Sequence, residues 1–320
     1  MSRALARLRS RTFAFALVLT LALLVVNLIV DESFAQWGGV PVTLGTLAPL
    51  ALVSMASTPA IISGGIDLSL GPLLSVCNIM MVAVLLPNGL GSPWLSIPIV
   101  LALGAAVGGI NGALVTVLRF PPVIATLASL FVLLGAAYDL APTPKEASTN
   151  WTGSLTGMVG PIPGALIIMA VPVVLWAALR FTPFLRTVYF VGDDDVAAFT
   201  SAANVTGTRI VAYALGGMIA ALAGLALTGV VHSGDSTLGL EYTLIALAAV
   251  VLGGTPLGGG AGGMIGAFFG ASSIYLIQNL IDAVNVNPTW LLVVYGGVLI
   301  VAAVLGGLVA REPQTAGRAT

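Results

Sequence analysis

Long apolar runs follow one another along almost the whole of this chain. A helix that spans the hydrocarbon core of a bilayer needs about 20 mostly apolar residues. Ten stretches meet that requirement to within a few residues: 12–30, 43–62, 69–86, 98–118, 123–140, 162–179, 210–230, 242–254, 263–281 and 289–308. The sequence therefore predicts an all-α fold, a polytopic bundle of about ten transmembrane helices, with residues 1–320 in a single domain.

Too few residues are charged to cover a water-soluble protein. Only 7% of the residues are charged and 58% are hydrophobic, with a mean hydropathy of +1.09, whereas soluble domains carry about 25% charged residues. The 39 glycines favour closely packed, interrupted helices, because small residues let helix backbones approach each other in a membrane. A single cysteine, Cys77, and a single histidine, His232, exclude an intrachain disulfide and a metal site built from Cys or His clusters.

The arginines predict the orientation of the bundle. When the spans are followed from a cytoplasmic N-terminus, every arginine falls on the inner side and the only lysine, Lys145, falls outside. Because inner loops of membrane proteins are enriched in positive charge, both termini are expected in the cytoplasm. The arginines are Arg3, Arg7, Arg9, Arg11, Arg119, Arg180, Arg186, Arg209, Arg311 and Arg318.

The N-terminus permits a second interpretation. Its four arginines, the apolar stretch that follows, and Ser33-Phe34-Ala35 together resemble a secretory signal with a cleavage site. The apolar stretch has about 19 residues, whereas the core of a signal peptide has about 7–15. This difference favours a first helix that is retained, and a cleaved first helix is the alternative.

The glycine-rich break between the second and third spans places an acidic residue at membrane depth. It reads Ser63-Gly64-Gly65-Ile66-Asp67-Leu68-Ser69-Leu70-Gly71. Gly64 and Gly65 permit a sharp reversal of the chain, and Asp67 or Ser69 can cap the N–H groups that open the next helix. A plain helix cap is the simpler interpretation, but an acidic residue at membrane depth is also a functional candidate.

The longest charged stretch, residues 180–209, lies wholly on the predicted inner side. Within it, Asp193, Asp194 and Asp195 precede a segment, 196–203, that is predicted to form a short helix. Acidic side chains favour a helix N-terminus because they complement the helix dipole. The segment is either a well-capped connecting helix or a docking element for a cytoplasmic partner.

Four stretches of the chain, in order, carry a family resemblance. They are the break at 63–71, then 109–115 with 119–127, then Val191-Gly192 with Ala197, Ala198 and Ser201, and last 248–255 running into 262–266. These stretches resemble the bacterial monosaccharide permeases of the ribose type, within the binding-protein-dependent ABC importers. The resemblance extends over nearly the whole chain, and four ordered matches are more specific than any single one.

The resemblance implies that a helix in the 180–209 loop docks on a separate ATPase subunit. The candidate coupling residues are Gly192, Asp193, Asp194, Asp195, Ala197, Ala198 and Ser201. A face of small side chains at Ala197, Ala198 and Ser201 would let such a helix seat closely. The family commonly has an acidic residue before the paired alanines and a glycine after the serine, where this chain has Val196 and Ala202. The detailed contacts are therefore expected to differ.

The resemblance also implies partners, location and cargo. The expected partners are a second permease copy, a cytoplasmic ATP-binding subunit, a periplasmic or extracellular solute-binding protein and membrane lipid, with no nucleic acid. The expected location is the bacterial cytoplasmic (inner) membrane. The expected cargo is a small polar solute, in the first place a monosaccharide, although relatives also import nucleosides and a sugar-derived signalling molecule.

The energy for transport must come from outside this chain. A P-loop requires a lysine directly after a glycine, and the only lysine follows Pro144. The chain is thus expected to be no enzyme and to bind no cofactor itself, while the partner ATPase uses ATP and Mg²⁺. A standalone ion-coupled carrier is the alternative. That class needs chained acidic or histidine side chains within the membrane, and only Asp67 and Glu241 lie close to a span interior.

Glycine and polar residues within and between the spans are the candidates for a translocation pathway or its gating. They are Gly64, Gly65, Asp67, Ser69, Asn78, Asn111, Thr126 and Asn279. A weak similarity between 63–71 and 253–258 also suggests two repeated halves, 43–140 and 210–308, a common design in transporters. Glycine-rich breaks can resemble each other by composition alone, and this is the alternative to a repeat.

Overall fold

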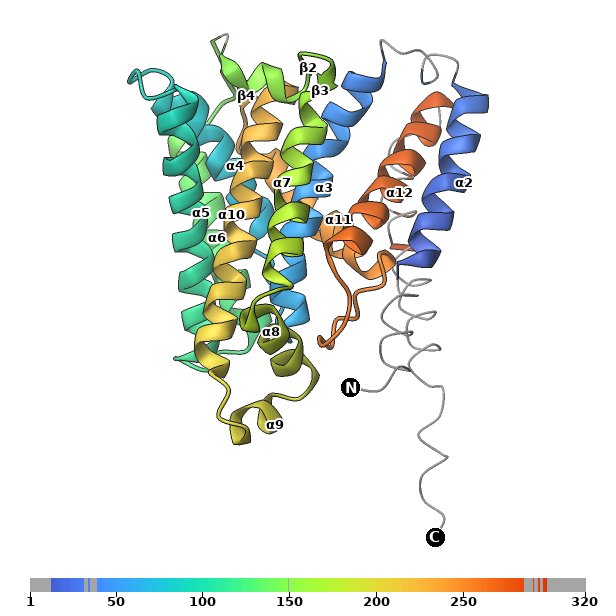
Figure 1. The fold of residues 1–320 in the computed structure, drawn as a ribbon. Helices are drawn as coiled ribbons and strands as arrows, with labels where there is room; N and C mark the ends of the chain where they lie inside the picture. The colour runs from blue at the N-terminus through green and yellow to red at the C-terminus, as the bar shows by residue number, and fades with distance from the viewer. Residues whose placement is uncertain are drawn as a thin grey trace.

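The computed structural model describes residues 13–31, 34, 39–148, 150–284, 290, 293, 296 and 297. Most of the predicted tenth span, 289–308, lies outside these residues, as do both termini and six of the arginines. The described chain forms a bundle of helices, most of them running along its long axis, with α9 at one end and the short strands at the other (Figure 1). We call these the α9 end and the β4 end.

Helices occupy the first nine predicted spans. They are α2 (Ala14–Val30), α3 (Val40–Ile62), α4 (Leu70–Ile79) with the π-helix η2 (Met80–Leu85), α5 (Pro93–Thr116), α6 (Pro122–Leu140), α7 (Gly164–Leu179), α10 (Val205–Val231), α11 (Leu238–Leu252) and α12 (Met264–Ala283). Two more helices, α8 (Pro183–Asp193) and α9 (Asp195–Thr200), lie between α7 and α10. The prediction of an α-helical membrane bundle is confirmed.

Five helices in the described part of the chain are long and apolar enough to cross a membrane, namely α3, α5, α6, α10 and α12. The pair α7 and α8, bent by 89° where they meet, gives a sixth if it is counted as one span. The helices α2, α4–η2 and α11 are apolar but shorter. The predicted spans therefore differ in length, and the short ones include those that flank the glycine-rich breaks.

Short irregular elements cover the β4 end. The strand β1 (Lys145–Glu146) pairs with β4 (Ser233–Gly234), and β2 (Met158–Val159) pairs with β3 (Ile162–Pro163). The 3₁₀ helix η3 (Trp151–Leu155) lies between β1 and β2 in the chain. These two-residue pairs tie loops together and leave the fold helical.

The helices α3 and α10 form the buried centre of the bundle. In each of them 67% of the most apolar window is buried, against 28% in α5 and in α6. Glycines let α5 lie directly on α10: a Cβ added at Gly108 would overlap the carbonyl of Tyr213. The outer helices leave large apolar side chains such as Phe131 exposed, as expected where lipid is the solvent.

Two helices, α4 and α11, begin inside the bundle rather than at its ends. The chain leaves α3 at Ile62, runs through 63–69, and starts α4 where the Leu70 side chain lies beside Gly216, near the middle of α10. It leaves α10 at Val231, runs through 232–237, and starts α11 against α4. Gly71 and Gly239 meet there, and a Cβ on either one would overlap the carbonyl of the other.

The two segments that lead into α4 and α11 each contain the same kind of hydrogen-bonded turn. Oδ1 of Asp67 accepts from the N–H (2.9 Å) and the hydroxyl (2.6 Å) of Ser69. Oδ1 of Asp235 accepts from the N–H (2.8 Å) and the hydroxyl (2.7 Å) of Thr237. The side-chain turn of Asp67 and Ser69 therefore recurs at Asp235 and Thr237. The glycine-rich 253–258 matches the other part of 63–71, the helix end: Gly254, with a φ of +82°, ends α11 with the same backbone bonds as Gly64, with +85°, after α3.

Candidate functional site

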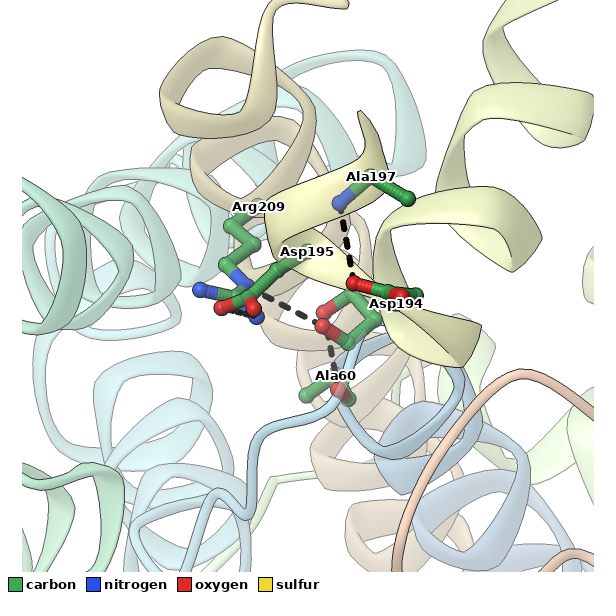
Figure 2. A network of polar contacts seen from close by, with 6 residues as sticks. Ala60, Asp194, Asp195, Ala197 and Arg209 are labelled. Carbon is green, nitrogen blue, oxygen red and sulfur yellow. Dashed lines mark hydrogen bonds and ion pairs between the residues drawn. The ribbon is translucent and has the colours of Figure 1, made fainter. Parts of the chain in front are cut away.

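The predicted docking segment is a short helix that stands at one end of the bundle. The side chain of Asp194 caps α9 by accepting from the N–H of Ala197 at 2.9 Å, as Figure 2 shows. Asp195 lies in the first turn, where a negative charge complements the helix dipole. The helix begins at Asp195, one residue before the predicted start at 196. It ends at Thr200, three residues before the predicted end at 203, and Ser201 is its C-cap residue.

Only part of the small face expected on α9 turns toward the bundle, and Ser201, the C-cap residue, is exposed. Ala198 is fully buried within this chain, and Ala197 is partly buried. Val196 is 69% exposed and Phe199 is 73% exposed. The exposed apolar surface of α9 is therefore formed by Val196 and Phe199, whereas Ala198 packs α9 on its own protein.

Gly192, at the end of α8, touches the break between α3 and α4. A Cβ on Gly192 would overlap the carbonyl of Ile62. The N–H of Gly260 donates to that same carbonyl at 3.0 Å, and a Cβ on Gly260 would press against Asp193. Three parts of the chain thus meet at one point, which we call the glycine junction. They are the end of α8, the end of α3 and the loop between α11 and α12.

From the sequence, Arg209 indicates only the orientation of the chain, and the structure gives it a contact role. Its Nε donates to the carbonyl of Ser63 at 3.0 Å, and its Nη2 pairs with Oδ2 of Asp195 at 3.2 Å (Figure 2). The contact role was missed because Ser63 is 146 residues away in the sequence. The only sequence signal was an arginine near the start of a long helix.

Four polar side chains form a cluster beside the start of α4. Nδ2 of Asn111 donates to the hydroxyl of Ser69 at 2.8 Å, and the hydroxyl of Ser129 bonds to Oδ1 of Asn111. Asp67 holds Ser69, as described above, and is only 6% exposed. Its other carboxylate oxygen has no hydrogen-bond partner among the described residues. The polar cluster therefore brings together Asp67, Ser69 and Asn111, and it adds Ser129.

The carbonyl of Ile66 joins the remaining candidates to this cluster. It accepts from the hydroxyl of Thr126 at 3.2 Å and from that of Tyr213 at 3.4 Å. The Tyr213 hydroxyl also lies against Gly65, where a Cβ would overlap it. Gly64 has a φ of +85°, which permits the reversal expected from the sequence. Ser69, in contrast, does not cap α4 with its side chain.

Asn78 and Asn279 lie elsewhere in the bundle. Nδ2 of Asn78 donates to Thr228 and to the carbonyl of Ser233, both at 2.9 Å, which holds the segment that leads into α11. Asn279 donates to Asn27 of α2 at 2.9 Å and lines a cavity of about 690 Å³ between α2, α3 and α12. The eight candidates therefore do not line one continuous surface. No group of three acidic, histidine or cysteine side chains in the described ranges could hold a metal ion.

Asp67 gives a test of the polar cluster. Asp67→Ala leaves the N–H and hydroxyl of Ser69 without their acceptor, and each buried unpaired group costs about 1–3 kcal/mol. We expect this variant to accumulate poorly in membranes and to lose solute uptake, while Asp67→Asn retains both because an amide oxygen accepts the same bonds. Immunoblots and uptake in the same cells measure the two effects.

Asp139→Ala, at an exposed carboxylate, is the control for Asp67→Ala. Equal behaviour of the two alanine variants would contradict a structural role for the cluster.

Comparison with known proteins places this chain among transport permeases. Residues 42–303 match the family described as branched-chain amino acid transport system / permease component. The chain is 35% identical to the ribose import permease protein of Bacillus subtilis (strain 168) over 289 residues, which is 88% of this chain and 89% of that protein. It is 31% identical to the fructose import permease protein of Rhizobium meliloti over 300 residues, 90% of this chain and 83% of the other.

A third relative names the membrane and the transporter class. The chain is 31% identical to an inner membrane ABC transporter permease protein of Escherichia coli (strain K12) over 258 residues, 78% of each chain. No solved structure matches the chain. The match to the family begins at residue 42, near the start of α3, and runs to residue 303. Each of the three alignments covers more than three quarters of the relative's length. The chain therefore belongs to the family of branched-chain amino acid transport system permease components.

Proposed function

We propose that this protein is the membrane-spanning subunit of a binding-protein-dependent ABC importer that carries a small polar solute, in the first place a monosaccharide. The observation that carries the proposal is α9, a capped helix that presents two exposed apolar side chains, Val196 and Phe199, at one end of an otherwise lipid-facing bundle. The printed names of the ribose and fructose permeases supply the class of solute.

The α9 end is proposed to face the cytoplasm of a bacterial cell. The described arginines, Arg119, Arg180, Arg186 and Arg209, all lie in or beside elements that end there (Figure 1). Lys145 lies at the opposite end, in the strand that pairs with β4. Positive charge gathers on the inner side of membrane proteins, so this distribution supports the orientation predicted from the sequence, with α9 able to meet a cytoplasmic ATPase.

Two inverted halves and a tenth span are proposed from one recurring spacing. The same number of residues separates Asp67 from Asp235, Leu70 from Leu238, and Asn111 from Asn279. These pairs hold equivalent places: the two acidic turns, the first residues of α4 and α11, and the amides of α5 and α12. The chain enters α4 from the α9 end and α11 from the β4 end, so the halves have opposite directions, as in many transporters.

The spacing also reaches residues beyond the described helices. Applied to α6 (Pro122–Leu140), it leads to residues 290–308, which nearly coincide with the tenth span expected from hydropathy at 289–308. Two independent arguments, apolar length and repeat spacing, thus support ten spans and halves close to 43–140 and 210–308. With an even number of spans and the α9 end inside, both termini are proposed to lie on the cytoplasmic side.

The mechanism follows from the contacts of α9. Closure of a partner ATPase pair would push on α9, and the glycine junction would pass the movement to the ends of α3 and α8. Packed helices respond to such a push by rigid-body rocking between alternative arrangements. A second permease copy would complete the pathway, and a solute-binding protein would deliver cargo at the β4 end. ATP and Mg²⁺ belong to the partner ATPase.

Reconstitution tests the proposal. Proteoliposomes that hold this permease with its candidate ATPase, and are supplied with a solute-binding protein and D-ribose, are expected to hydrolyse ATP faster when the binding protein is loaded and to accumulate ribose. A Walker A variant of the ATPase is the control and should abolish uptake. Uptake that persists with that variant, or without any ATPase, would contradict the importer and favour an ion-coupled carrier.

A further inference from the structure

Arg209 lies between α9 and the break at 63–69, the segment that leads from α3 to the polar cluster. It belongs to the first turns of α10, and its side chain is 19% exposed. In Figure 2 its guanidinium reaches away from α10 toward Asp195 of α9 on one side and the end of α3, near Ala60, on the other. One side chain thus joins α9 and α10, which follow each other in the sequence, to the end of α3, which is distant from both.

The contact with α3 is made at the helix C-terminus. Nε of Arg209 donates to the carbonyl of Ser63, the C-cap residue of α3, which has no following helical N–H to accept from. The C-terminal end of a helix carries a partial negative charge, which favours a guanidinium there. Nη2 also lies within 3.4 Å of the place where a Cβ of Gly64 would stand. Arg209 therefore contacts the first two residues of the break.

The contact with α9 is an ion pair at the surface. Nη2 lies 3.2 Å from Oδ2 of Asp195, whose side chain is 52% exposed. Solvent-exposed ion pairs of this kind contribute little to stability. Their geometry can still matter, because the planar guanidinium binds two acceptors at fixed angles while a lysine ammonium acts as a point charge. The pair is suited to holding α9 at a set position relative to α3.

We infer that Arg209 is a positioning residue for energy coupling, which ties movement of α9 to the break at 63–69 and so to the polar cluster at Asp67. This inference rests on the proposed importer function. It assigns to Arg209 a role that its place at a helix start does not require. The path it defines is short: Asp195, Arg209, Ser63, and then four residues to Asp67.

The test compares Arg209→Gln with Arg119→Gln in the reconstituted complex. Arg119 is exposed, lies at the same end, and makes no hydrogen bond or ion pair among the described residues. We expect Arg209→Gln to keep ATP hydrolysis while D-ribose uptake per ATP falls about tenfold, within the 5–150-fold range of typical allosteric coupling. Arg119→Gln should stay within about twofold of the unmodified complex, a change that is small on this scale.

A second variant keeps the inference testable if Arg209→Gln fails to assemble. Asp195→Asn removes the charge of an exposed side chain and leaves the contact with Ser63 intact. It is expected to lower uptake per ATP, and the double variant should be no worse than Arg209→Gln alone because the two changes break one link. If Asp195→Asn or Arg209→Gln takes up as much ribose per ATP hydrolysed as the unmodified complex, the inference is overturned. Absence of ATP-driven uptake in the unmodified complex would instead overturn the proposed function.

Discussion

Replacing Gly71 with alanine is expected to abolish solute uptake and to leave little folded protein in the membrane. An added Cβ would overlap the carbonyl of Gly239 and the hydroxyl of Thr243, and it would approach the N–H of Thr243 to 2.9 Å. Two of these three are backbone atoms of a helix that is itself packed on α3 and α12. They cannot move aside as a flexible side chain could, and overpacking of a tight core costs about 1–3 kcal/mol or more.

The effect should extend beyond stability because Gly71 and Gly239 join the two proposed halves. α4 and α11 cross at these residues, each near its first turn. If the halves move against each other during transport, this contact is one of the places where their backbones lie closest. Gly239→Ala should therefore have the same effect, since its Cβ would overlap the carbonyl of Gly71 and approach the Ser75 hydroxyl to 2.6 Å.

Gly109→Ala is the matched control for both variants. Gly109 lies within α5, and nothing stands within 4 Å of its added Cβ. Alanine is favoured over glycine in a helix by about 1 kcal/mol, so this variant should fold and transport normally. The amount of protein in membranes, its thermal unfolding in detergent and its uptake are measured in parallel. Normal folding and uptake in Gly71→Ala would show that the helices separate more easily than their contact implies.

The sequence predicted the helical bundle well because long apolar runs and glycine breaks are local signals. Helices stand at the first nine predicted spans, and the helix before Ser201 forms where the aspartates indicate it. The sharp reversal at Gly64 also follows from its neighbours alone, since only glycine adopts a positive φ without strain. These features depend on residues a few positions apart.

The candidate site was predicted less well because its contacts join distant segments. Arg209 contacts Ser63, which is 146 residues away in the sequence, and no local pattern reveals that contact. The face of α9 was assigned from the size of its side chains, whereas its packing on α8 and α10 decides which face is buried. The glycine pattern shared by 63–71 and 253–258 marks two similar helix ends, at Gly64 and Gly254, while the turn at Asp235 depends on an acceptor and a hydroxyl.

Phe199→Ala is expected to release the partner ATPase while leaving this protein folded. Phe199 is 73% exposed, and surface substitutions usually change stability by about 0.5 kcal/mol or less. A buried aromatic at the centre of an interface contributes about 2 kcal/mol or more, so affinity for the ATPase should fall about 30-fold or more. Uptake and stimulated ATP hydrolysis should be lost together, because both require the two subunits to touch. Binding of the purified ATPase to the permease in nanodiscs measures the change directly.

Two further variants separate docking from packing. Phe181→Ala removes an aromatic side chain that is even more exposed, at 87%, but lies outside α9, and it should leave affinity for the ATPase unchanged. Ala198→Leu inserts bulk on the opposite, fully buried face of α9. It should destabilise this protein through overpacking and displace α9 even when no ATPase is present, which lowers its thermal unfolding temperature. If Ala198→Leu instead leaves unfolding unchanged and weakens ATPase binding as much as Phe199→Ala, then the small side chains form the docking surface after all, and the orientation of α9 argued above is wrong.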